Sequence, residues 1–101
     1  MLVHIVFWKL VDQASNGKSK QENALELKRR FEALRGAIPG LATIEVGVDI
    51  SATAESSDVA LYTEFDSPAA LDAYQVHPLH QEIVGFLKEI RSERRVVDYH
   101  R

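Results

Sequence analysis

The side chains best suited to acid–base chemistry lie in the segment AYQVHPLHQEI, residues 73–83. It holds two of the chain's four histidines, His77 and His80, with Pro78 between them and Tyr74 just before. Histidine titrates near neutral pH and can remove a proton from a carbon beside a carbonyl group, and a tyrosine hydroxyl can donate a hydrogen bond to the enolate oxygen that forms. The segment therefore carries a candidate general base and a candidate hydrogen-bond donor.

Pro78 decides whether these groups can act together. In one continuous helix, Tyr74 and His80 would point to different faces. A proline disfavours helical backbone at the residue before it, so a helix that contains Tyr74 should end or bend at His77. The bend changes how Tyr74 and His80 lie relative to one another.

Each of these residues also has an ordinary structural explanation. His77 precedes a proline and could cap the next helix without any catalytic role. His80 could be a helix histidine that is bonded to a backbone carbonyl or to a carboxylate across a dimer. Tyr74 could be a core residue beside Leu71 with its hydroxyl at the surface.

A third histidine, His4, lies in the apolar segment LVHIVFWKL at residues 2–10. Asp98 or Glu64 could serve as its polar partner, so it could simply be a buried histidine whose hydrogen bonds are satisfied. Two imidazoles at positions 77 and 80 could approach one metal ion, but no fixed third or fourth ligand lies nearby in the sequence. We expect no metal site and, because no cofactor-binding motif is present, no cofactor.

Composition narrows the classes of function. A chain of 101 residues predicts a single domain spanning residues 1–101. The net charge is −3, and the basic residues at 28–30 and 35 lie among glutamates, so no basic stripe suggests nucleic acid as a partner. There are no cysteines, which excludes disulfide and thiol chemistry and is compatible with the cytoplasm, the location we expect. The apolar N-terminal segment is too short to cross a bilayer, and we expect no membrane partner.

Residue patterns predict four strands and two helical regions. The first helix should begin at the capping box of Ser19 and Glu22 and carry an apolar stripe from Leu27 to Ile38. Ser67 and Pro68 mark the start of the second helical region, which is broken at residues 77 and 78. The strands are expected at residues 2–10, 41–50, 58–65 and 94–100. The order βαββαβ predicts an α+β ferredoxin-like fold, a four-stranded antiparallel sheet with both helical regions on one face.

The two faces of that sheet should differ in chemistry. We assign to the helix side the nearly pure apolar set Val3, Ile5, Phe7, Ile44, Val46, Val48, Val59, Leu61 and Phe65. The other face then holds His4, Val6, Trp8, Leu10, Thr43, Glu45, Ala60, Tyr62, Glu64, Val96, Asp98 and His100.

This second set is too apolar for a face in water and too charged for a dry interior. It predicts a homodimer in which a second copy covers the face and encloses a small-molecule pocket. The ligand-binding residues would be Val6, Trp8, Tyr62 and His77. A dimer interface without a cavity, polar only at its rim, is the alternative.

Several segments together resemble the stress-responsive α/β-barrel family, also named the Dabb domain. They are HIVFWKL at 4–10, IPGLATIEVGVD at 38–49, TEFDSPAALDAYQVHPLHQEI at 63–83 and VVDYH at 96–100. The resemblance implies ferredoxin-like protomers that pair through their sheets into a dimeric α/β barrel. Plant members are associated with stress responses, and one plant branch includes polyketide cyclases that close a poly-β-ketone by an aldol step without a cofactor.

The resemblance also implies roles for three residues. By motif, His80 would be the base, Tyr74 its partner and His4 the histidine of the first strand. Cyclase-like members can carry another histidine where the third strand begins, and this chain has Asp58 and Val59 there.

Three hypotheses of function follow. The first is a stress-associated homodimer with an interior pocket for a small apolar or oxygenated ligand. The second is a cofactor-independent cyclase or lyase in which His80, Tyr74 and His4 are catalytic. The third, a monooxygenase, rests on shared architecture only.

Overall fold

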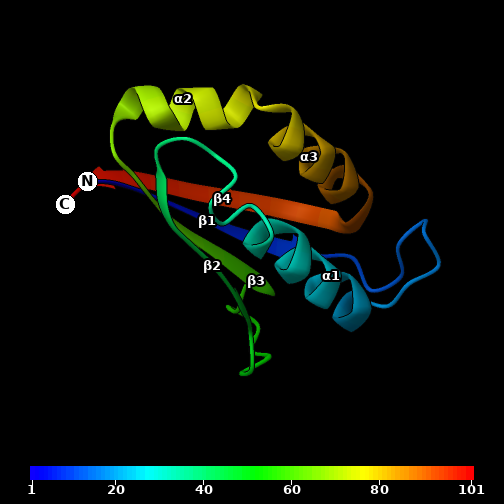
Figure 1. The fold of residues 1–101 in the computed structure, drawn as a ribbon. Coiled ribbons are helices and arrows are strands. Elements are labelled where there is room, and N and C mark those ends of the chain that lie inside the picture. Colours follow the sequence, from blue (N-terminus) through cyan, green and yellow to red (C-terminus); the bar gives the residue numbers. More distant parts are fainter.

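The computed structural model describes all 101 residues, which form four strands and three helices with connecting loops. In chain order they are β1 (Leu2–Leu10), α1 (Lys20–Glu32), β2 (Leu41–Val48), β3 (Val59–Phe65), α2 (Pro68–Val76), α3 (Pro78–Ile90) and β4 (Arg91–His100). The strands form one antiparallel sheet in the order β2-β3-β1-β4, and the helices are layered on it (Figure 1). The predicted ferredoxin-like α+β fold is confirmed.

The two chain ends lie side by side at one end of the sheet (Figure 1). β1 and β4 run antiparallel along their whole length, and the N-terminal amino group donates a hydrogen bond to the Arg101 carbonyl at 3.2 Å. β1 is therefore an interior strand and β4 is the edge strand beside it. Their pairing places His4 opposite Asp98.

The prediction of which β1 residues face the helices was wrong. Trp8 stacks on Phe31 of α1 with ring centroids 5.6 Å apart, and His4 meets the Tyr74 ring of α2 at 6.5 Å. Strand pairing sets this orientation, because Val6 lies opposite Leu61, and paired residues of an antiparallel sheet share a face.

The residues predicted for the helix side therefore divide between the two faces. Val3, Ile5 and Phe7 lie on the face away from the helices, together with Tyr62, while His4, Val6, Trp8 and Leu10 join Leu61 beneath the helices. β1 is apolar on both sides, so its sequence does not say which side is covered.

α1 is shorter than predicted, because the expected apolar stripe ran to Ile38. The capping box is present, with Ser19 Oγ accepting from the Glu22 N–H and Glu22 Oε1 accepting from the Ser19 N–H, both at 3.1 Å. The helix ends at Glu32 because the chain turns at Gly36, whose φ of +79° is a left-handed conformation that favours glycine. Leu34 and Ile38 lie beyond the helix but are still buried in the core.

Two strand boundaries also differ from the prediction. β4 begins at Arg91, three residues earlier than expected, directly after α3. β2 ends at Val48, and Ile50, which was expected to continue the strand, is 97% exposed in the following loop.

Gly40 allows α2 to pack close to the turn before β2. A Cβ atom at this position would lie 2.5 Å from the Cβ of Ala70, closer than real Cβ contacts come, and its φ is +81°. The close approach of Ala70 and the positive φ both require glycine at this position. The turn that Gly40 forms positions the start of α2 over the sheet.

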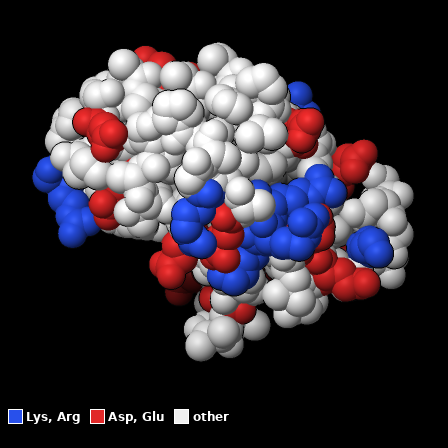
Figure 2. Space-filling view, in the orientation of Figure 1, with Lys and Arg blue, Asp and Glu red and all other residues white.

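No helix is long and apolar enough to cross a bilayer. In the view of Figure 2, lysine and arginine atoms over the α1 side of the molecule are mixed with aspartate and glutamate atoms. Three ion pairs between residues three or four positions apart on α1 explain this mixture, since Glu26 pairs with Arg29 and Arg30 and Glu32 pairs with Lys28.

Candidate functional site

A small cavity of about 80 Å³ lies between the sheet and the helices. Its walls come from β1, β3, β4, α1 and α3. The residues that line it are His4, Val6, Trp8, Phe31, Leu61, His80, Val84, Leu87, Arg91 and Arg94. Apolar walls with a few polar groups are the usual composition of small-molecule sites.

The helix break at His77 and Pro78 orients His80. In a continuous helix the Gln75 carbonyl would accept from the Leu79 N–H, but the Leu79 N–H donates instead to His77 Nδ1 at 3.1 Å. The Gln75 carbonyl is thereby available to His80 Nδ1, which lies 3.1 Å from it. Since a carbonyl oxygen only accepts, Nδ1 carries the proton and Nε2 keeps its lone pair.

Burial keeps His80 in its neutral form. Desolvation is the main cause that lowers the pKa of the half-buried imidazole below 6.5, and the charges of His4, Arg94 and His77 lower it further. The hydrogen bond to the Gln75 carbonyl opposes these effects only in part. At neutral pH, His80 is therefore an unprotonated base on the wall of the cavity.

His4 is held by a carboxylate on the neighbouring strand. Its Nδ1 lies 2.5 Å from Asp98 Oδ1, and its side chain is almost fully buried while that of Asp98 is partly exposed. The pairing of β1 with β4 places residues 4 and 98 directly opposite one another. Asp98 accepts the Nδ1 proton, so the imidazole presents Nε2 on the other side. Of the two partners considered from sequence, Asp98 is the correct one.

Tyr74 lies behind the cavity wall and packs against both histidines. Its ring centroid is 4.3 Å from that of His80 and 6.5 Å from that of His4. The hydroxyl is buried and has no hydrogen-bond partner in the chain. Burial raises the pKa of Tyr74 far above its usual value, so the hydroxyl stays protonated and is a donor.

Trp8 is the second residue with an unpaired buried donor. Its ring lines the cavity and stacks on Phe31, while the indole Nε1–H makes no hydrogen bond. Buried donors without partners are uncommon in folded proteins. One of them belongs to Trp8, which lines the cavity, and the other belongs to Tyr74, which lies behind its wall.

The structure thus places the predicted site residues in two groups. His4, Val6, Trp8 and His80 line the same cavity, with Tyr74 packed behind them. The cavity lies within one protomer beneath the helices, whereas we expected these β1 side chains to face the second copy.

Tyr62 and His77 lie apart from this cavity. The Tyr62 hydroxyl is on the opposite face of the sheet, where it donates to Glu64 at 2.6 Å and accepts from Arg101 at 3.0 Å. The side chain of His77 caps α3, the structural role considered for it from sequence. A ligand-binding role for either residue remains a prediction.

Sequence reasoning missed Phe31, Arg91 and Arg94 as residues of the cavity. Phe31 was identified only as part of the apolar stripe of α1, and stacking on Trp8 places it in the wall. The two arginines were missed because a bulge between Lys9 and Leu10, at the start of β4, decides where they point. The one sequence feature that could have indicated Arg91 and Arg94 as site residues was the cluster of arginines in RSERR at residues 91–95.

Asp58, which stands where cyclase-like members can carry another histidine, has a structural role here. Its Oδ2 accepts from the Leu10 N–H at 2.7 Å and lies 3.5 Å from Lys20 Nζ. It does not line the cavity, and the histidines that do are His4 and His80.

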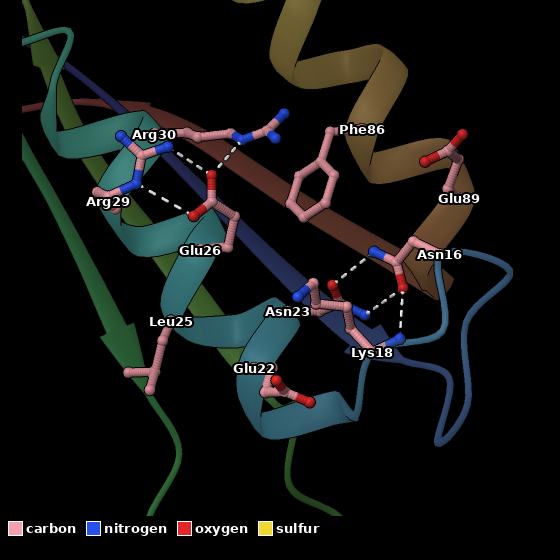
Figure 3. Close-up of a pocket in the computed structure, with 10 residues that line it drawn as sticks. All are labelled: Asn16, Lys18, Glu22, Asn23, Leu25, Glu26, Arg29, Arg30, Phe86 and Glu89. Carbon is pink, nitrogen blue, oxygen red and sulfur yellow. Dashed lines mark hydrogen bonds and ion pairs between the residues drawn. The ribbon is translucent and has the colours of Figure 1, made fainter.

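A larger hollow between α1, α3 and the loop before α1 is a surface groove of about 640 Å³ (Figure 3). Many of its polar groups already bind one another, since Glu26 accepts from Arg29 and Arg30, and the side-chain amides of Asn16 and Asn23 are bonded at 2.8 Å. It contains no unpaired buried donor and no histidine, so it has less of the chemistry of a reactive site than the smaller cavity. No group of three or more His, Cys, Asp or Glu side chains could hold a metal ion.

The model of one family, described as the stress responsive A/B barrel domain or Dabb, matches residues 2–101. The chain belongs to this family. The Dabb match includes the first-strand histidine and the Tyr74 to His80 segment, whose geometry is described above. No curated protein matches the chain.

Two solved structures extend the comparison to the Dabb fold and its assembly. A dimeric protein of unknown function and ferredoxin-like fold from Bacteroides fragilis is 33% identical, with a TM-score of 0.87, covering 99% of this chain and 95% of that one. A dimeric ferredoxin-like protein of unknown function from Jannaschia sp. CCS1 is 27% identical, with a TM-score of 0.77, covering 99% of this chain and 98% of that one. A hydroxynitrile lyase from Passiflora edulis is 20% identical, with a TM-score of 0.78, covering 97% of this chain and 90% of that one, and shares the fold alone.

Proposed function

We propose that this Dabb protein binds a small oxygenated molecule in the cavity beneath its helices and removes a proton from it, without a cofactor. The observation that carries the proposal is the hydrogen bond from His80 Nδ1 to the Gln75 carbonyl, which leaves Nε2 as a free base on the cavity wall. The lowered pKa of His80 supports the same role. A base with a pKa near or below the working pH is unprotonated and ready to accept a proton.

The reaction uses three residues. His80 Nε2 takes a proton from a carbon beside the substrate carbonyl, and the electron pair of the broken C–H bond forms the enolate. Tyr74 packs against His80 behind the cavity wall, and its unpaired hydroxyl is the proposed hydrogen-bond donor for the enolate oxygen. His4, fixed by Asp98, orients the substrate with its Nε2. The enolate carbon then attacks a second carbonyl, whose oxygen takes the proton from His80 Nε2 to give the aldol product, or the enolate carbon itself takes that proton back.

The size of the cavity indicates a small substrate. A water molecule needs roughly 10–15 Å³ of such volume, and pockets for drug-sized ligands are roughly 300–1,000 Å³. At about 80 Å³, the cavity has room for only a few non-hydrogen atoms. We therefore propose a small ketone or aldehyde in place of the long poly-β-ketone of the plant cyclases.

A role in binding alone is the second candidate, and Asp58 favours it. In place of the additional histidine of cyclase-like members, Asp58 is bonded to the backbone of β1 and contributes no acid–base group to the cavity. A stress-associated protein that holds a small ligand without transforming it would need the cavity but not the base. The solved structures described as antibiotic biosynthesis monooxygenases are 19% identical or less and share only the fold, so they add no monooxygenase activity to the proposal.

We also propose that the chain is a homodimer formed through the free face of the sheet. Phe7, Val97 and Tyr99 are 37%, 45% and 44% exposed there, more apolar surface than a strand face in water usually presents. The dimeric state of the relatives from Bacteroides fragilis and Jannaschia supports this assembly.

Deuterium exchange into 2-butanone tests the proton abstraction directly, because the test needs neither a second substrate nor a known product. The chain in D₂O should exchange the protons beside the carbonyl faster than buffer does, as followed by proton NMR. We expect His80→Gln to reduce the catalysed rate by about 10²-fold or more, the usual effect of losing a general base. The rate should fall as the pH falls through the pKa of His80, which lies below 6.5.

His100→Gln is the matched control, because it changes a histidine that does not line the cavity while leaving His80 and its helix cap in place. It should keep most of the catalysed rate if the protein remains folded. A rate that is no faster than buffer, or that His80→Gln leaves unchanged, would remove the base from the proposal and leave the binding role.

A further inference from the structure

Two arginines at the cavity have no partner in the chain. Of the seven arginines, four form ion pairs with carboxylates, and Arg35 donates to the Ile44 carbonyl. Only the side chains of Arg91 and Arg94 have neither kind of bond, although the chain carries more acidic than basic residues. Both of them line the cavity.

A β-bulge brings the two guanidinium groups to the same side of the sheet. Residues three apart on a regular strand point to opposite faces. Here Arg94 lies opposite Trp8 and Arg91 lies opposite Leu10, with the register shifted between Lys9 and Leu10. Because Trp8 and Leu10 both point beneath the helices, Arg91 and Arg94 do so too. Bulges that re-aim a side chain are frequent beside active sites.

None of the residues that line the cavity carries a carboxylate. The nearby Asp98 is already bonded to His4. Glu93 points to the other face, where it pairs with Arg95. Arg94 and His80 line the same cavity, and after desolvation the charge of Arg94 is among the causes that lower the pKa of His80.

We propose that Arg91 and Arg94 form an anion subsite at the mouth of the cavity, and that the natural ligand is a small carboxylate whose carbonyl group reaches His80. The inference rests on the proposed function for its site and adds the class of substrate. Arginine suits this role because its planar guanidinium binds a carboxylate through two parallel hydrogen bonds. A carboxylate held at the mouth would leave the remaining few atoms of the ligand for the apolar interior.

Binding of propionate and of propionamide tests the subsite without any turnover. The two molecules have the same shape and number of non-hydrogen atoms, and only propionate is charged. Trp8 is the single tryptophan and lines the cavity, so its indole N–H resonance in a ¹H–¹⁵N spectrum reports occupancy. We expect propionate, titrated at constant ionic strength, to bind at least about tenfold more tightly than propionamide, the scale of a charge-assisted hydrogen bond.

The double variant Arg91→Gln with Arg94→Gln should lose this preference while its affinity for propionamide stays the same. Arg95→Gln is the matched control, because Arg95 is the neighbouring arginine on the opposite face and should leave the preference intact. Equal binding of the two ligands to the unchanged protein, no saturable binding of propionate, or a preference that survives in the double variant would overturn the subsite.

The two proposals fail in different ways. If the subsite is wrong, propionate loses its advantage, but 2-butanone is still exchanged through His80. If the base is wrong, exchange is absent or insensitive to His80→Gln, while the preference for propionate and its dependence on the arginines remain.

Discussion

Of two buried hydroxyl groups under the helices, one has a hydrogen-bond partner in the chain and the other has none, a difference that affects both stability and function. Thr63 Oγ1 donates to the His4 carbonyl at 2.6 Å, whereas the Tyr74 hydroxyl has no partner. Both side chains are completely buried. A buried hydroxyl without a partner lowers stability, and a protein keeps one more readily where a ligand can supply the missing bond.

This contrast predicts opposite effects for two conservative substitutions. Thr63→Val removes a satisfied hydrogen bond and should lower the free energy of unfolding by about 1 kcal/mol. Tyr74→Phe removes no bond within the chain and should leave the free energy of unfolding unchanged or slightly higher, while reducing the exchange of 2-butanone protons. Urea unfolding of the two variants beside the unchanged protein measures both effects. A Tyr74→Phe variant as unstable as Thr63→Val would show that the hydroxyl has a partner in solution.

At the scale of elements, the break between α2 and α3 is what turns a helix histidine into an oriented base. Pro78 ends α2, His77 caps α3, and the Gln75 carbonyl is left free to accept from both His80 and the side chain of Gln81. The same break brings His80 against the ring of Tyr74, which regular helical geometry would keep on another face. Local backbone chemistry and the arrangement of the site are therefore coupled here.

The capping role of His77 can be separated from any chemical role by two substitutions. His77→Ala removes the acceptor of the Leu79 N–H and should destabilise the protein by about 1 kcal/mol, the usual cost of losing an N-cap. His77→Asn supplies a better capping side chain and should restore or exceed the original stability. Thermal unfolding of both variants checks this expectation. Equal stability of the two variants would argue against the cap as the reason for a histidine at this position.

At the scale of the whole molecule, the helices cover only one face of the sheet and leave the other face free, and we propose that a second copy covers it. That free face combines exposed apolar side chains with an ion pair between Arg101 and Glu64 at 2.8 Å, which also binds the Tyr62 hydroxyl. A mixed face of this kind suits an interface with an apolar centre and polar groups around it. The cavity beneath the helices does not depend on the second copy for any residue that lines it.

Light scattering at micromolar concentration should give a mass of two chains. Val97→Glu places a charge on the free face and should shift the mass toward one chain, because burying an unpaired carboxylate in an interface is costly. Val76→Glu is the matched control, since Val76 is 74% exposed on α2, away from that face. A mass of one chain for the unchanged protein, or an equal effect of both variants, would contradict a dimer through the sheet.

The sequence by itself determined the order of elements, the start of α1 and the break at Pro78. Each of these depends on local chemistry: the reciprocal bonds of Ser19 and Glu22, the restricted backbone of proline and the alternation of residues in β3. The choice of His80, Tyr74 and His4 as candidate site residues also came from local motifs and family resemblance. His4 and His80 line one cavity and Tyr74 packs behind its wall, and the catalytic roles of the three stay predictions.

Only the tertiary structure decided which face of β1 carries the site and which residues complete it. Residues 2–10 are apolar on both sides of the strand, so the choice of face came from pairing with β3, a contact between residues 51–63 positions apart. The bulge that turns Arg91 toward the cavity is likewise a property of how β1 and β4 align. Such long-range pairing depends on the packing of the whole chain, which no short stretch of sequence specifies.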